Sequence, residues 1–266
     1  TPSPWLGNQE HIVNWYGDGT EIYACRPAAV VRNPNFYFLK GVTWSDVSSK
    51  GFAARLSPGG FIHDVKGMTC FPKEEDLPFI LGLLNSRFAK FVLAALNPTI
   101  SNQVGDIERL PVPSERSEKI SELVDRCVEL ARQDSRESEI TYDFVQPAVS
   151  PEAVSARKSI LAGKETEIDA EVSRLYGLSD EDLAAIDREL SGTPAATEGD
   201  PAEETTGEEE EEASLAVLSA GESARGWISY AGGIVLGRFE VGVTDGLGRG
   251  RSEEHTSELQ SRQSLS

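Results

Sequence analysis

The chain has 266 residues, of which 39% are hydrophobic, and its formal net charge is -19 at neutral pH. This length allows one large or two small domains, and so low an apolar fraction makes a single core through the whole chain unexpected. Up to Leu110 ten basic residues balance ten acidic ones, so the whole negative surplus lies later. The acidity therefore does not exclude nucleic-acid binding by the first half, although it gives such binding no electrostatic support.

The cysteines indicate the cellular compartment of the protein, and the first residues indicate whether the sequence is part of a longer chain. Cys25, Cys70 and Cys127 are isolated, and an odd, sparse count argues against a disulfide scaffold and favours a reducing cytoplasm. No basic-then-apolar signal segment opens the chain. Residue 1 is Thr and the one methionine is Met68, so we expect a piece of a longer protein.

The first third predicts short strands between loops. Residues 1–34 are rich in Trp, Gly, Asn and Pro, which favours a loop with one or two short strands, such as Glu21–Ala24. Residues 44–49 predict a turn or short helix. The turn signal at 57–60 predicts that the strands on its two sides form a hairpin. The expected strands are Asn35–Thr43, Phe52–Leu56 and Phe61–Val65.

A near-continuous apolar helix is expected over 77–96, capped by Asp76 and ended by Asn97-Pro98. The run has membrane-like length. It carries Asn85, Arg87 and Lys90, so we interpret it as a buried core helix, with no membrane association.

Three further helices are predicted. The first begins at a Ser114 cap and runs to about residue 134, with one apolar face formed by Ile120, Leu123, Val124, Cys127, Val128, Leu130 and Ala131. The second opens at Ser150-Pro151, is interrupted at Gly163 and stops at Gly177. Ser179 and Asp182 have capping-box spacing and begin a short helix to Leu190.

The last part changes in composition. Residues 191–214 hold nine acidic and no basic residues, which predicts a disordered linker. Arg251–Ser261 reads like a sequencing adapter translated in frame, so the true end is expected near Gly250. The expected division is an α+β domain at 1–113, a helical region at 114–190, the acidic linker at 191–214, a small segment at 215–250 and an artificial tail at 251–266.

Catalytic signatures are missing from the sequence. It has neither a Walker phosphate loop nor a Gly-x-Ser-x-Gly motif, and its glycine-rich segments lack a strand and helix of the dinucleotide-binding kind. His11, Cys25, His63 and Cys70 have no metal-ligand spacing, and a half-buried structural role is favoured for His63.

Polar and aromatic side chains suited to DNA gather in two places. Amides can bond adenine, arginine can bond guanine, and Ser and Lys suit phosphates. The alternative for each residue is a solvated face or a cap, and for Asn97 and Thr99 we favour a structural role at the helix end. The candidate DNA-binding residues are Trp44, Ser45, Ser48, Lys50 and Arg55 around the first strands, and Arg87, Asn102 and Gln103 around the central helix.

Four ordered segments resemble one family. YFLKGVTWSDVSSKGFAARLSPGGFIHDVKG, LLNSRFAKFVLAALNPTISNQVGDIERLPVP, EIDAEVSRLYGLSDE and WISYAGGIVLGRFEV are similar to segments of the PglX family, the adenine-specific DNA methyltransferases of the BREX phage-defence system. The resemblance implies methyl transfer from S-adenosylmethionine to an adenine flipped out of duplex DNA. That class carries an Asn-Pro-Pro-Tyr-type motif behind a glycine-rich loop, and this chain has neither.

The resemblance therefore implies a fragment that reads DNA for a catalytic domain located upstream, and that is inactive and binds no cofactor by itself. Two alternatives stay open. The chain is the specificity region of a fused restriction-modification enzyme, or it is a scaffold that binds other phage-defence proteins through the helix at 114–134 and the acidic linker.

Overall fold

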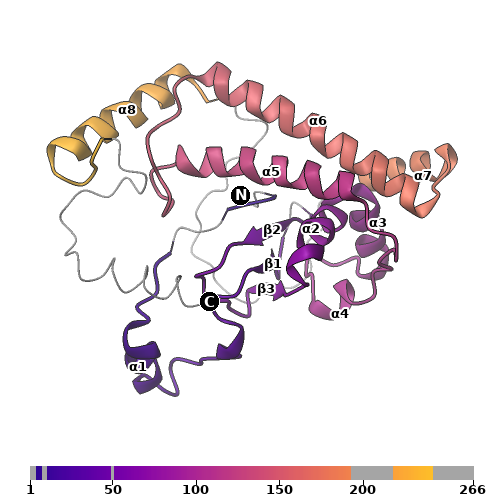
Figure 1. Ribbon diagram of the computed structural model, residues 1–266, viewed down its shortest axis with the longest axis horizontal. Coiled ribbons are helices and arrows are strands. Elements are labelled where there is room, and N and C mark those ends of the chain that lie inside the picture. Colours follow the sequence, from indigo (N-terminus) through magenta and orange to yellow (C-terminus); the bar gives the residue numbers. More distant parts are fainter. Residues whose placement is uncertain (1–3, 8–10, 49–50, 193–217, 242–266) are drawn as a thin grey trace. The chain divides into compact units, whose positions relative to one another are not determined.

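A computed structural model describes residues 4–7, 11–48, 51–192 and 218–241 (Figure 1). Contacts divide the chain into two compact units, Thr1–Ala131 with Ile160–Ala213, and Arg132–Ser159 with Ser214–Ser266. The predicted α+β class is confirmed, since a small antiparallel sheet is accompanied by many helices. Almost all of the predicted acidic linker and all of the adapter-like tail lie outside the described residues, and the predicted domain boundaries stay a prediction.

The expected strand at Glu21–Ala24 is wrong, because these residues belong to helix α1, Tyr16–Ala24. The first turns of α1 are irregular, with positive φ at Gly17, Asp18 and Gly19. Gly19 lies against the Trp15 ring, and a Cβ at this position would come within 2.9 Å of it. A short 3-10 helix, η1, follows at Pro34–Phe36.

The sheet has three antiparallel strands in the order β2-β1-β3, with β1 in the centre (Figure 1). The strands are β1 Gly41–Ser45, β2 Ala54–Ser57 and β3 Gly67–Cys70. The predicted hairpin is wrong, since β2 and the segment after the turn do not pair. Gly60 N donates to Phe38 O and Phe38 N donates to Phe61 O, so the turn residues bond the chain that precedes β1. The third strand begins only at Gly67, and the segment predicted as a turn supplies the end of β1.

Two unrelated segments cover the outer edge of β2. The backbone of Trp5 donates to Ala54 O at 3.1 Å and accepts from Leu56 N at 2.7 Å. The Asn85 side chain bonds both backbone groups of Ala54, each at 2.9 Å, in the manner of a neighbouring strand. The exposed hydrogen-bonding groups of an edge strand are thereby satisfied.

The expected single helix over 77–96 is wrong, because it is two helices, α2 Leu77–Asn85 and α3 Arg87–Leu96, bent by 68°. The break falls at Ser86, whose hydroxyl donates to Leu83 O and accepts from Ala89 N, so it caps α3. The Asp76 carboxylate accepts from Arg116 Nε at 2.8 Å, and makes no cap. A short helix η2, Glu74–Asp76, precedes α2.

The expected burial of this region is confirmed for α2, most of whose residues lie in the core. Among the described residues, no helix is by itself long and apolar enough to cross a membrane. The segments Glu74–Asn85 and Arg87–Leu96 reach that length and composition only when they are taken together across their bend.

The remaining helices are α4 Val104–Ile107, α5 Glu118–Arg136, α6 Pro151–Tyr176, α7 Asp180–Gly192 and α8 Ala220–Val235. The predicted apolar face of α5 is confirmed, since all seven of its residues are buried. Gly163 does not interrupt α6, because a lone glycine weakens a helix without ending it. The stop at Gly177, where φ is +63°, and the capping box of Ser179 with Asp182 are confirmed.

The core of the first unit depends on a close approach of α2 and α5. A Cβ at Gly82 would lie 2.7 Å from side-chain carbons of Ile120 and Val124. The second unit has its own small cluster, in which Phe144 packs against Tyr230 and Phe239. There Trp227 of α8 donates to Ala148 O.

Candidate nucleic-acid interface

Asp46 is the centre of a polar cluster directly after β1. Its Oδ1 accepts from Ser101 Oγ at 3.0 Å and from Gln103 Nε2 at 2.6 Å. Its Oδ2 lies 3.2 Å from Lys66 Nζ. The hydrogen bond from Ser101, followed by the interaction with Lys66, lowers the pKa of Asp46, so the carboxylate is ionised at neutral pH. One carboxylate thus joins the end of β1 to the segment after α3.

The backbone fixes the same segment to the sheet. Asn102 N donates to Asp46 O at 2.6 Å, and Ser48 N donates to Ile100 O at 3.0 Å. Trp44 is only 1% exposed, and its Nε1 donates to Asn102 O at 2.9 Å. Three residues of β1 and its extension, Trp44, Asp46 and Ser48, therefore hold residues 100–102 against the sheet.

The structural role predicted for Asn97 and Thr99 is confirmed. Asn97 Nδ2 donates to Ser101 O at 3.0 Å and to Asp106 Oδ2 at 2.8 Å. The Thr99 hydroxyl and backbone N–H both donate to Asn97 Oδ1. Asn97 thus closes the end of α3 and shapes the segment that carries Asn102 and Gln103.

Arg55 is a buried cation on β2, with an exposed fraction of 3%. It lies opposite Thr43 in the register of β1 and β2. Its Nη2 donates to Ser45 Oγ at 2.8 Å, while its Nε and Nη1 are buried without a hydrogen-bond partner. Burial lowers the pKa of the guanidinium, which nevertheless remains charged.

The other candidates have different surroundings. Ser48 donates its hydroxyl to Gly51 O, and Lys50 lies outside the described residues. Arg87 begins α3, where its side chain is 2.5 Å from Asp187 Oδ1 and its backbone N–H donates to Asp169. The structure therefore brings Trp44, Ser48, Asn102 and Gln103 together around Asp46 and the segment after α3. Ser45 and Arg55 form a separate pair, and the side chain and backbone of Arg87 contact α7 and α6.

Sequence reasoning missed Asp46 and Lys66. The two residues are 20 positions apart, and the register of β1 and β3, in which Ser45 lies opposite Gly67, brings them together. Because the third strand was predicted at Phe61–Val65, whereas β3 is Gly67–Cys70, this pairing was missed. An acidic residue directly after the TWS sequence was the one local signal available.

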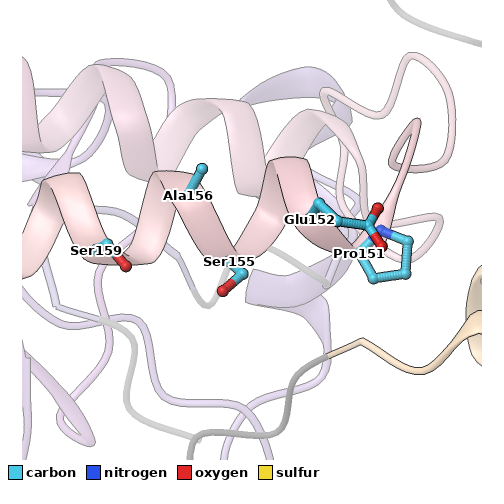
Figure 2. Close-up of a pocket in the computed structure, with 5 residues that line it drawn as sticks. All are labelled: Pro151, Glu152, Ser155, Ala156 and Ser159. Atoms are coloured by element: carbon cyan, nitrogen blue, oxygen red, sulfur yellow. The ribbon is translucent and has the colours of Figure 1, made fainter.

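The expected structural role of His63 is confirmed, since its ring contacts Thr69 Oγ1 and Leu39 O, and burial lowers its pKa. Within the described ranges, no three His, Cys, Asp or Glu residues are grouped as a metal site would need. Figure 2 shows a pocket whose lining residues all come from the start of α6: Pro151, Glu152, Ser155, Ala156 and Ser159. Hydrogen bonds from its own backbone N–H and from the Ser150 side chain lower the pKa of the Glu152 carboxylate in this pocket. We therefore assign no catalytic role to the pocket.

The chain is similar in sequence to two known proteins. No family model matches it. It is 31% identical over 143 residues, 53% of its length, to the adenine-specific methyltransferase BrxX of Escherichia coli O9:H4 (strain HS). It is 26% identical over 247 residues, 89% of its length, to the adenine-specific methyltransferase PglX of Lacticaseibacillus casei (strain Zhang).

The chain is therefore related to adenine-specific methyltransferases. More closely, it is a relative of the methyltransferases of the BREX system. The matched regions make up 12% of the E. coli relative and 20% of the L. casei relative.

Proposed function

We propose that this chain is the DNA-reading and C-terminal part of a site-specific adenine DNA methyltransferase that acts in phage defence. The parent enzyme would use S-adenosylmethionine, and the catalytic domain would lie upstream. Both curated relatives carry the name of this activity and are several times longer than the region they share with the chain. By itself the chain would neither bind the cofactor nor transfer a methyl group, because it lacks both signatures of that chemistry.

The observation that carries the proposal is the Asp46 cluster. It presents the exposed Gln103 amide from a segment held by the sheet. A rigid support for a few polar groups is what reading base edges requires. We assign DNA reading to residues 1–113, in which Asn102 and Gln103 would contact the bases. Trp44 would position Asn102 through the hydrogen bond from its indole N–H to Asn102 O.

For the other candidates we propose contributions to the same complex. Ser45 would orient Arg55, and Ser48 and Lys50 would approach the phosphates. Arg87 would contribute only if DNA extended along α3, because its side chain is engaged with Asp187. Duplex DNA is thus the proposed partner in the cytoplasm, and other phage-defence proteins are the further partners that we propose.

The test is binding of the 266-residue chain to a random-sequence duplex library, followed by salt titration on the selected site. A DNA-reading chain enriches one sequence motif, and its affinity falls as salt rises because phosphate contacts release counterions. Binding without an enriched motif, or no binding, contradicts the proposal. A chain that instead captures defence proteins and ignores DNA would be the scaffold.

The reading frame upstream of the Thr1 codon separates the two enzyme alternatives. An Asn-Pro-Pro-Tyr motif behind a glycine-rich loop is expected for the methyltransferase. An additional nuclease motif would make the parent a fused restriction-modification enzyme.

A further inference from the structure

Gln103 is held so that only one of its two hydrogen-bonding groups is available to a ligand. Its Nε2 donates to Asp46 Oδ1 at 2.6 Å and to Ser101 Oγ at 2.7 Å. A side-chain amide has two N–H donors, so both are engaged within the protein. The remaining group is the carbonyl oxygen, Oε1.

The direction of these hydrogen bonds is fixed by chemistry. An ionised carboxylate only accepts hydrogen bonds, so the amide must turn its NH2 group toward Asp46. The Ser101 hydroxyl donates its hydrogen bond to Asp46 Oδ1 at 3.0 Å, so its oxygen can accept a hydrogen bond from Gln103. The alternative amide orientation would bring Oε1 against the carboxylate oxygen, which is repulsive.

The carbonyl oxygen keeps acceptor capacity. At the start of α4 Gln103 bonds Asp106 through its backbone, since Gln103 N donates to Asp106 Oδ2 at 3.2 Å. A carbonyl oxygen has two lone pairs, and the Asp106 N–H already donates to the backbone oxygen of Gln103 at 3.0 Å. Gln103 is exposed, and with its two donors engaged the carbonyl oxygen is the amide group that remains for a ligand.

We infer that Gln103 reads the exocyclic amine of a base through its carbonyl oxygen alone, and that Asp46 is the positioning residue that imposes this preference. The inference rests on the proposed DNA-reading function and makes it more specific. Free glutamine side chains bond adenine bidentately, donating to N7 and accepting from N6. In this chain the donor half of that contact is occupied, so N7 is not read by Gln103.

The experiment uses the 266-residue chain and the duplex that it selects from a random library. Gln103→Ala first identifies the base pair whose preference is lost. In that pair the amine is then removed, with deoxynebularine for dA or deoxyzebularine for dC, and in a second duplex the purine is replaced by its 7-deaza analogue. Val112→Ala, an exposed and uncharged position outside the Asp46 cluster, is the matched control and should bind like wild type.

Removal of the amine should weaken wild-type binding by about five-fold, the value of one hydrogen bond, and should not affect Gln103→Ala. The 7-deaza duplex should bind as tightly as the parent duplex. Asp46→Asn supplies a second measure, because an amide at position 46 can donate to Oε1 and lets Gln103 turn its donors outward. This variant should gain sensitivity to the 7-deaza substitution.

Equal losses with the two analogues would mean bidentate reading and would overturn the inference. So would a specific duplex whose binding depends on neither the amine nor Gln103, although DNA reading itself would stand. Absence of any selected motif would instead remove the proposed function, and the inference with it.

Discussion

At the scale of single residues, Arg55 is a cation that folding alone does not favour. Its guanidinium is 3% exposed, and one of its three nitrogens has a hydrogen-bond partner, Ser45. Burying a charge without compensation costs several kcal/mol, and apolar replacements of buried ions are often stabilising. A residue kept at such a cost is typical of a functional site.

We predict that Arg55→Met stabilises the 266-residue chain by about 1–3 kcal/mol while it weakens binding to the selected DNA site. Urea denaturation gives the first quantity and equilibrium binding gives the second. Thr43→Val serves as a control, because it changes the residue opposite Arg55 and leaves the cation in place. A variant that loses stability would assign Arg55 to the fold, and one that binds DNA normally would remove it from the site.

Residue types alone identified Arg55, Asn102 and Gln103 as candidates, but could not identify how they are held. Asp46 accepts hydrogen bonds from Ser101 and Gln103, which lie 55 and 57 positions later in the sequence, and no local pattern reveals contacts at such a separation. Trp44 was expected among the DNA-binding residues because aromatic side chains suit that role, whereas its indole lies in the core beneath Asn102.

At the scale of elements, the break between α2 and α3 orients the segment that follows. Hydrophobic continuity predicted one helix, because each half is a good helix on its own. Asn85, the last residue of α2, bonds both backbone groups of Ala54, 31 residues away in the sequence. Sequence reasoning located both ends of this region correctly and missed the bend, because the Ser86 cap and the Asn85–Ala54 contact at the break leave no trace in the hydrophobic pattern.

Two glycines within helices provide a matched pair of substitutions. Gly82→Ala should destabilise the chain by about 1–3 kcal/mol, because its Cβ would lie 2.7 Å from Ile120 and Val124 and overpack the core. Gly163→Ala should stabilise it by up to about 1 kcal/mol, because the Cβ meets no atom within 4 Å and alanine favours the helix.

Chemical denaturation of both variants checks this prediction. Opposite signs support the close packing of α2 on α5. Equal stabilisation of the two variants would mean that the helices are farther apart than described.

At the scale of the whole molecule, composition and charge predicted an acidic chain whose first part is neutral, and strand and helix patterns predicted its α+β class. The order of strands in the sheet was not predicted. The turn at 57–60 indicated a hairpin between the segments on its two sides, whereas β2 and β3 both pair with β1. The family resemblance had a different basis, in four motifs distributed along the chain, and the relatives bear it out.

The central claim is that this chain selects the DNA sequence that a methyltransferase modifies. The most direct measurement is sequencing of methylated adenines in cells that express the complete reading frame containing this chain, as wild type and as Gln103→Ala. We expect methylated adenines within one sequence motif for the wild type, and a motif that loses its preference at one base pair in the variant. No adenine methylation by the complete protein, or an identical motif in both, would contradict it.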